Sequence, residues 1–261
     1  MLLVNRPRVA VIQLYGTISS GVRMGNILRL VDAVRDSRRA RAVVLDIDSP
    51  GGLATTSQHL YLTIAKLADR KPVVAFIRGT GASGAYMAAC AATKVIALPT
   101  ALVGSIGVVS IRPLVPQLLE RLGIRFHVAK GGHLKDMGAF WREPTPEEEQ
   151  KEEGLIDAYY QDFIDTVTKG RIMERRRVEK LATGEVFPAM QAKEAGLVDE
   201  LGDLDTAIDA AASLGGVAPR YYNLRPRRPL LERVLAPQAA SLGEALLLQA
   251  EDLLSRRIYF Q

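Results

Sequence analysis

Short apolar runs alternate with segments of helical periodicity through the first hundred residues of this 261-residue chain. The apolar runs, rich in valine, isoleucine and alanine, predict strands at residues 9–14, 42–47, 72–77 and 95–98. The segments between them predict helices at residues 27–38, 54–69 and 83–92. Strands and helices that alternate at this spacing are typical of βαβ units. We therefore predict an α/β fold built around a mainly parallel sheet.

The second half of the chain is predicted to be mostly helical. Helical patterns cover residues 115–122, 146–168, 175–181, 189–195 and 204–214, with one further strand expected at 126–129. These elements complete one predicted domain over residues 1–218. The remaining residues, 219–261, read as a basic linker rich in proline and arginine, followed by an amphipathic helix from Leu242 to Leu254.

Composition and charge narrow the classes of protein that this chain can represent. Hydrophobic residues make up 48% of the chain, which supports a sizeable core. The net charge is +5, but residues 1–218 hold 27 basic against 25 acidic side chains, so no nucleic-acid-binding face is expected. Cys90 is the single cysteine, and no Cys/His cluster has the spacing of metal ligands, so we expect no disulfide, metal or cofactor.

The N-terminal residues do not resemble a signal peptide. The segment Met1–Arg6 becomes charged before an apolar stretch of sufficient length can form. The mostly apolar stretch over residues 79–111 contains Lys94, Pro99 and several glycines, so it reads as buried core. We expect a cytoplasmic protein, with peripheral membrane contact through the C-terminal helix as an alternative to a free linker.

Two glycine-containing turns follow predicted strands. The turn Asp48–Gly52 (DSPGG) ends the second strand, and Gly81–Tyr86 (GASGAY) follows the third strand with Ser83 at the start of a helix. Ligands of open α/β sheets bind beyond the carboxyl ends of the strands, so both turns lie where a site is expected. Taken alone, Ser83 could be no more than a helix N-cap, because serine is a preferred residue there.

Serine and lysine side chains in this pattern indicate acyl-transfer chemistry without histidine. A serine nucleophile needs a base within hydrogen-bonding reach, and a buried lysine can act as one. Lys135 has apolar neighbours that would desolvate it, and Lys130 is a rival five residues earlier. Ser105 is a candidate for orienting the base. Gly52 and Gly84 can present backbone N–H groups to an oxyanion.

Four ordered motifs resemble the signal peptide peptidase A family, which comprises serine–lysine proteases of the Clp-protease/crotonase-like fold. The motifs are Asp48–Gly52, Ala82–Tyr86, Gly104–Gly107 and Gly131–Asp136. Further similarity lies at Arg171–Met173, Gly184–Phe187 and Gly196–Glu200, so that the resemblance covers about residues 8–215. Ala85 departs from the pattern, because a second glycine is frequent at this position.

The resemblance implies a spiral of βαβ units and assigns a role to each candidate. Ser83 is implied as the nucleophile, Lys135 as the general base and Ser105 as the residue that positions the lysine. Gly52 and Gly84 are implied as oxyanion-hole donors. The resemblance also implies a ring-like or dome-like homo-oligomer, in which the lysine comes from the same chain or from a neighbouring subunit.

The function expected from these residues is that of a serine endopeptidase. It would hydrolyse peptides, such as remnant signal peptides or membrane-derived fragments, through an acyl-enzyme. A crotonase-like acyl-CoA enzyme is an alternative, since paired amides also stabilise an enolate. A catalytically inactive oligomeric scaffold is a third reading. His59, His127 and His133 are the only histidines, and none follows Ser83 at the spacing of a Clp-type Ser-His-Asp triad.

Overall fold

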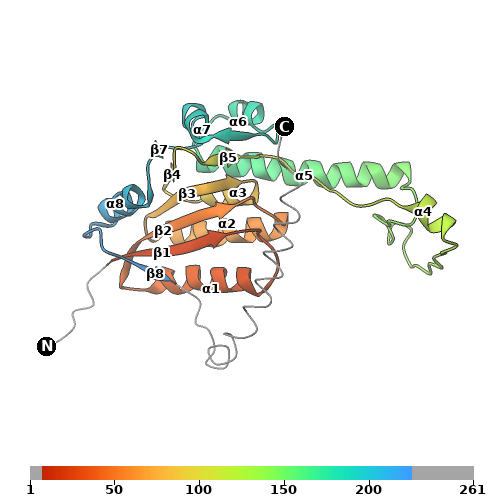
Figure 1. Ribbon diagram of the computed structural model, residues 1–261, viewed down its shortest axis with the longest axis horizontal. Helices are drawn as coiled ribbons and strands as arrows, with labels where there is room; N and C mark the ends of the chain where they lie inside the picture. Colours follow the sequence, from red (N-terminus) through yellow and green to blue (C-terminus); the bar gives the residue numbers. More distant parts are fainter. Residues whose placement is uncertain (1–7, 225–261) are drawn as a thin grey trace, which may run out of the picture. The chain divides into compact units, whose positions relative to one another are not determined.

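The computed structural model describes residues 8–224, and the elements within this range alternate as expected in the first half of the chain (Figure 1). The strands are β1 (Arg8–Tyr15), β2 (Ala40–Ser49), β3 (Val73–Ala82), β4 (Lys94–Ala97), β5 (Leu102–Gly104), β6 (Val186–Pro188), β7 (Glu200–Leu201) and β8 (Tyr221–Leu224). The helices are α1 (Val22–Asp36), α2 (Ala54–Ala68), α3 (Gly84–Ala89), α4 (Pro116–Arg121), α5 (Pro146–Gly170), α6 (Arg175–Leu181), α7 (Ala189–Ala195) and α8 (Leu204–Gly215).

All eight strands of the described range belong to one sheet. Its main order is β6-β5-β3-β2-β1-β8, and β4 extends a branch from β3 to β7. Every pairing is parallel except the antiparallel contact between β5 and β6. The predicted α/β class with a mainly parallel sheet is therefore confirmed.

Helices cover both faces of the sheet, which explains why the central strands are mostly apolar. Alternate residues in register face opposite layers: Ile12, Leu45 and Ala75 join the core beneath α1 and α2, whereas Val11, Val44 and Val74 pack against α8. The first of these two cores is the larger and also includes α3 and the C-terminal part of α5. The β2 and β3 residues that pack with α8 include Val44 and Val74, and the candidate site forms beyond the carboxyl ends of these strands, where β2 ends at Ser49 and β3 at Ala82.

The structure differs from the sequence-based expectations in five strands: one predicted strand is absent, and four short strands were not predicted. Residues 126–129 form no strand, because no neighbouring strand lies beside them, and the Phe126 ring instead stacks on Trp141 with 4.9 Å between the centroids. The strands β5, β6, β7 and β8 were not predicted. The last of these pairs with β1, so the sheet includes residues beyond 218, and the compact unit ends at Leu224.

The predicted helix from Leu242 to Leu254 lies outside the described residues. Within residues 8–224, no helix combines the length and the apolar composition needed to cross a membrane.

Residues 108–145, which we call the arm, leave the sheet between β5 and α5. In Figure 1, the part of the arm that contains α4 lies away from the sheet, near the first turns of the long helix α5. None of the α4 residues is buried. Beyond α4, Phe126, Phe140 and Trp141 form an aromatic cluster with centroid separations of 4.9–5.7 Å.

Candidate active site

Ser83 occupies a strained turn between β3 and α3. Its backbone has φ 51° and ψ −125°, a conformation that side-chain-bearing residues rarely adopt. The nucleophile elbow of serine hydrolases likewise places its serine on a strained strand-to-helix turn. The Ser83 side chain makes no capping hydrogen bond to α3, so this serine does not serve as a side-chain helix cap. Ser83 instead lines a cleft.

The turn formed by Gly51 and Gly52 packs directly against this elbow. A Cβ atom on Gly51 would lie 2.8 Å from the Ser83 Cβ and 2.7 Å from the Gly84 nitrogen. A Cβ atom on Gly52 would overlap the carbonyl group of Ile18. Both positions therefore require glycine, because a side chain would push the two turns apart.

The N–H groups of Gly52 and Gly84 donate to no acceptor within residues 8–224. Gly84 opens α3, so its N–H has no partner inside the helix and lies at the positive end of the helix. Two free backbone donors next to a serine hydroxyl are what the stabilisation of an acyl-transfer oxyanion requires.

Ser105 lies beside Ser83 because β5 pairs with the end of β3. The Ser83 N–H donates to the Gly104 carbonyl at 2.7 Å, and the Ser105 N–H donates to the Glu185 carbonyl at 2.7 Å. Ser105 also has a positive φ of 49°. The two serines line one cleft, each held in an uncommon backbone conformation by the strand pairing next to it.

The cleft has a volume of about 890 Å³ and contains Ser83, Ser105, Gly52 and Gly84 in its lining. Its walls come from α2, α3, α5 and the start of the arm and are largely apolar. The apolar lining residues include Ile18, Leu53, Met87, Val108 and Phe163. A cleft of this size and composition suits a peptide segment.

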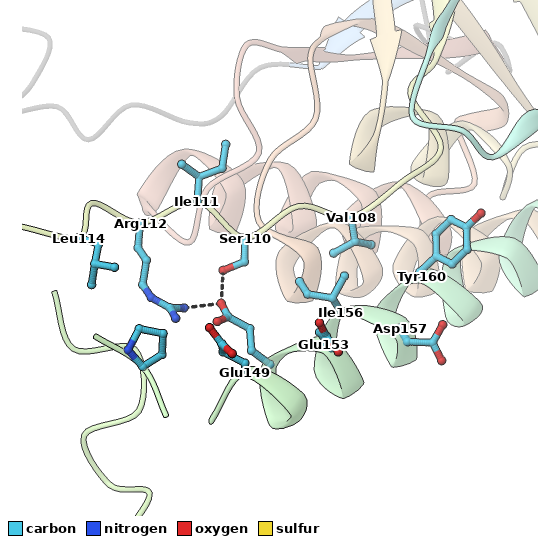
Figure 2. A pocket seen from close by; sticks show the side chains of 12 residues that line it. Val108, Ser110, Ile111, Arg112, Leu114, Glu149, Glu153, Ile156, Asp157 and Tyr160 are labelled. Carbon is cyan, nitrogen blue, oxygen red and sulfur yellow. Dashed lines mark hydrogen bonds and ion pairs between the residues drawn. The ribbon is translucent and has the colours of Figure 1, made fainter. Parts of the chain in front are cut away.

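A second hollow of about 850 Å³ begins where the cleft ends, since Val108 and Tyr160 line both (Figure 2). It lies between the arm and the first turns of α5. The Ser110 hydroxyl donates to the Glu152 carboxylate at 2.8 Å, and Arg112 forms an ion pair with the same carboxylate. Figure 2 draws these contacts as dashed lines from the labelled Ser110 and Arg112. The guanidinium of Arg112 lowers the pKa of Glu152. These contacts fasten the start of the arm to α5.

Lys135 lies on the arm and is absent from the lining of the cleft. Its side chain is exposed and takes part in no hydrogen bond or ion pair within residues 8–224. The desolvation expected from its apolar neighbours is therefore not provided by its own chain. Lys130 is engaged by Asp136 and by the His133 carbonyl at 2.8 Å. No lysine or histidine of the described chain lines the cleft.

Sequence reasoning overlooked three polar side chains in the same cleft. Ser57 is buried against Gly84, and its hydroxyl has no hydrogen-bond partner among the described residues. The Gln58 side-chain amide donates to the Asp162 carboxylate at 2.8 Å. Gln58 and Asp162 are separated by 104 positions, so no local motif could have linked them.

Several known proteins are similar to this chain over most of its length. A protein of Synechocystis, whose name assigns it provisionally to the proteases, is 35% identical over 233 residues, covering 88% of this chain and 83% of that protein. The chloroplastic serine protease SPPA of Arabidopsis thaliana is 33% identical, over 79% of this chain and 32% of its own length. The present chain thus spans about a third of that relative.

A solved structure shares the fold at low sequence identity. The membrane-bound stomatin-specific protease superposes with a TM-score of 0.56 and 15% identity, covering 85% of this chain and 99% of the other. This likeness confirms the expected Clp-protease-like fold. The family model of Peptidase family S49 matches residues 65–218, a segment that contains the Ser83 elbow, Ser105 and Lys135. Together with the relatives, this match shows that the chain is a serine peptidase that belongs to peptidase family S49.

Proposed function

We propose that this chain is the subunit of an oligomeric endopeptidase in which Ser83 is activated by the partner subunit's Lys135. The carrying observation is the strained Ser83 elbow next to the free N–H groups of Gly52 and Gly84. The absence of any lysine or histidine from the cleft lining of residues 8–224 supports a base supplied by a second copy.

The proposed reaction runs through an acyl-enzyme. The Ser83 hydroxyl attacks the peptide carbonyl carbon while its proton passes to the neutral amine of the partner subunit's Lys135. The N–H groups of Gly52 and Gly84 hold the resulting oxyanion. The C–N bond then breaks, and the leaving amine takes the proton from the lysine ammonium. A water molecule, deprotonated by the same lysine, hydrolyses the ester and returns the proton to Ser83.

Ser105 is proposed to orient the lysine from the strand next to the nucleophile. Its position beside Ser83, fixed by two backbone hydrogen bonds of 2.7 Å, supports this role. The hydroxyl can accept a hydrogen bond from the lysine nitrogen, which would point the nitrogen lone pair at Ser83.

The surface of the arm supports assembly into an oligomer. Several of its large apolar side chains are strongly exposed in the single chain, which is typical of a protein–protein interface. The most exposed of them are Val109 at 75%, Ile111 at 87% and Leu122 at 63%. A second copy that covers these side chains would also bring its own arm, and with it a second Lys135, to the cleft of its neighbour.

The proposed substrates are extended peptides, including remnant signal peptides and membrane-derived fragments, bound in the apolar cleft. The catalytic domain is proposed to run to Leu224, and residues 225–261 to act as the basic linker and amphipathic helix. A cytoplasmic location with peripheral membrane contact completes the proposal. The acyl-CoA enzyme and the inactive scaffold are not favoured, because the family match and the named relatives are peptidases.

Labelling with a fluorophosphonate probe tests this function. The full-length protein is expected to form one covalent adduct, located on Ser83 by peptide mass spectrometry, and Ser83→Ala is expected to form none. Lys135→Ala is expected to label much more slowly, although its fold is unchanged, because the hydroxyl loses its base. Equal labelling of folded Ser83→Ala, or none of the wild type, would contradict the proposal.

A further inference from the structure

One carboxylate stands in the lining of the otherwise uncharged Ser83 cleft. Asp162 projects from α5 into the same cavity that holds Ser83, and Gln58 reaches it from α2. The Gln58 Nε2 donates to the Asp162 Oδ2 at 2.8 Å. Because this bond joins α2 to α5, it fixes the carboxylate in a cleft that is also lined by Met87 and Phe163.

The charge of Asp162 is not compensated within residues 8–224. No ion pair reaches its carboxylate, and the neighbouring Asp165 is paired with Arg175. Burial raises the pKa of Asp162, and the charge of Asp165 raises it further. A partly buried carboxylate without a cation is unfavourable, so its placement in a substrate cleft requires an explanation.

The chemistry of the pair fits a basic side chain of the substrate. Gln58 occupies one oxygen of Asp162 and leaves two acceptors free, the Asp162 Oδ1 and the Gln58 Oε1. Lysine and arginine have long aliphatic stems that pack on apolar surface while the charged head reaches a polar group. The stem would contact Met87 and Phe163, and the head would bind the two acceptors.

We propose that Asp162, positioned by Gln58, selects peptide substrates that place a lysine or arginine side chain in the Ser83 cleft. This inference rests on the proposed peptidase function and names the substrate feature that the cleft recognises. Charge-assisted hydrogen bonds of this kind are strong enough to raise kcat/KM by about tenfold or more.

The alternative is that the bond between Gln58 and Asp162 only joins α2 to α5. Asp162→Asn separates the two roles, because an asparagine can still accept the hydrogen bond from Gln58 but carries no charge. Asp157→Asn is a matched control, since this exposed aspartate on the same helix also accepts a hydrogen bond from a glutamine, Gln161, at 3.0 Å.

The experiment compares pairs of fluorogenic peptides that differ only by lysine or methionine, at each of four positions before the scissile bond. The wild-type protein is expected to cleave the lysine peptide at least tenfold faster in kcat/KM at one of these positions. Asp162→Asn is expected to abolish this preference, so that the lysine and methionine peptides are cleaved with similar kcat/KM. Asp157→Asn is expected to keep the preference.

Two results would overturn the inference: no lysine preference in the wild type, or an unchanged preference in Asp162→Asn. Fluorophosphonate labelling of Ser83 in every variant distinguishes these outcomes from a failure of the peptidase function itself, in which Ser83 would not label at all.

Discussion

The backbone N–H of Ser83 donates to the carbonyl oxygen of Gly104 at 2.7 Å, and this bond places the two serines of the cleft side by side. Ser83 and Ser105 each have a φ near +50°, at the end of a strand whose partner holds the backbone in place. A strained backbone conformation of this kind persists only when the surrounding structure holds the residue in it. The rigid sheet therefore sets the position of both hydroxyl groups before any substrate binds.

Ser105→Ala is expected to lower kcat by about 10- to 100-fold and to change KM little, because misplacement of a catalytic group by about 1 Å can reduce the rate by such a factor. The substitution keeps the backbone bonds and removes only the hydroxyl proposed to orient the lysine. Steady-state kinetics on a fluorogenic peptide measure both constants. Ser110→Ala is the control, since the Ser110 hydroxyl binds Glu152 on α5; an undiminished kcat in Ser105→Ala would rule out the positioning role.

Gly84→Ala is expected to destabilise the fold by about 1–3 kcal/mol through overpacking. The new methyl group would overlap the Ser57 hydroxyl, which is buried directly against Gly84. Because the clash is with a side chain, Ser57→Gly should relieve it, although glycine inside α2 itself lowers stability by about 1 kcal/mol.

A double-mutant cycle measures the relief. Denaturant unfolding of the wild type, the two single variants and the double variant should give a coupling free energy of about 1 kcal/mol or more. Strictly additive effects would mean that Gly84 is needed for another reason, such as the approach of a substrate.

The parts of the fold that were predicted correctly from the sequence share one property: each is indicated by residues that are neighbours in the chain. The first four strands are built around short, mostly apolar runs, and the turns at Gly52 and Ser83 follow strands β2 and β3. The strands β6, β7 and β8 have two to four residues and exist because a partner strand lies beside them. Residues 126–129 are the opposite case: this apolar run was predicted to be a strand, but it forms none because no partner strand lies beside it.

The same distinction applies to the site. Ser83, Ser105, Gly52 and Gly84 belong to motifs with recognisable spacing, and the structure brings all four into one cleft. The exposed position of Lys135 could not be predicted, because it depends on where the arm leaves the sheet. The hydrogen bond between Gln58 and Asp162 depends on how α2 packs against α5, and no sequence motif indicates this packing.

Acidification is expected to release the arm from α5. Arg142 donates to the buried Glu148 carboxylate at 2.7 Å and also to Asp136 at 3.1 Å. The guanidinium of Arg142, helped by the Thr145 N–H, lowers the pKa of Glu148 from 4.5 to about 2. A lowered pKa in the folded state means that these bonds stabilise the arm fully above pH 4.5, and that the stabilisation disappears as the pH falls towards about 2.

Trp141 reports this release, because it is the only tryptophan and stacks on Phe126 in the arm. Its fluorescence emission should remain constant down to about pH 4.5 and shift to longer wavelength between about pH 4.5 and 2. In Glu148→Gln, which carries no titratable group at this position, the shift in this range should be smaller. An emission spectrum that is unchanged at pH 2 would contradict the role of Arg142 as the anchor.

Mixing two inactive variants tests the proposed sharing of the site between subunits. Ser83→Ala lacks the nucleophile and Lys135→Ala lacks the base, so each homo-oligomer is expected to be inactive. In mixed oligomers, a cleft with an intact Ser83 can receive the lysine of a neighbouring Ser83→Ala subunit. Peptidase activity should therefore reappear at a substantial fraction of the wild-type rate.

The mixture must be shown to exchange subunits, which differently tagged copies and co-purification establish. Its activity should be highest near equal amounts of the two variants and should disappear when either variant is in large excess, because active clefts need one subunit of each kind. Exchange without recovered activity would mean that Ser83 and Lys135 act within one chain, and that the arm must then fold back towards its own cleft.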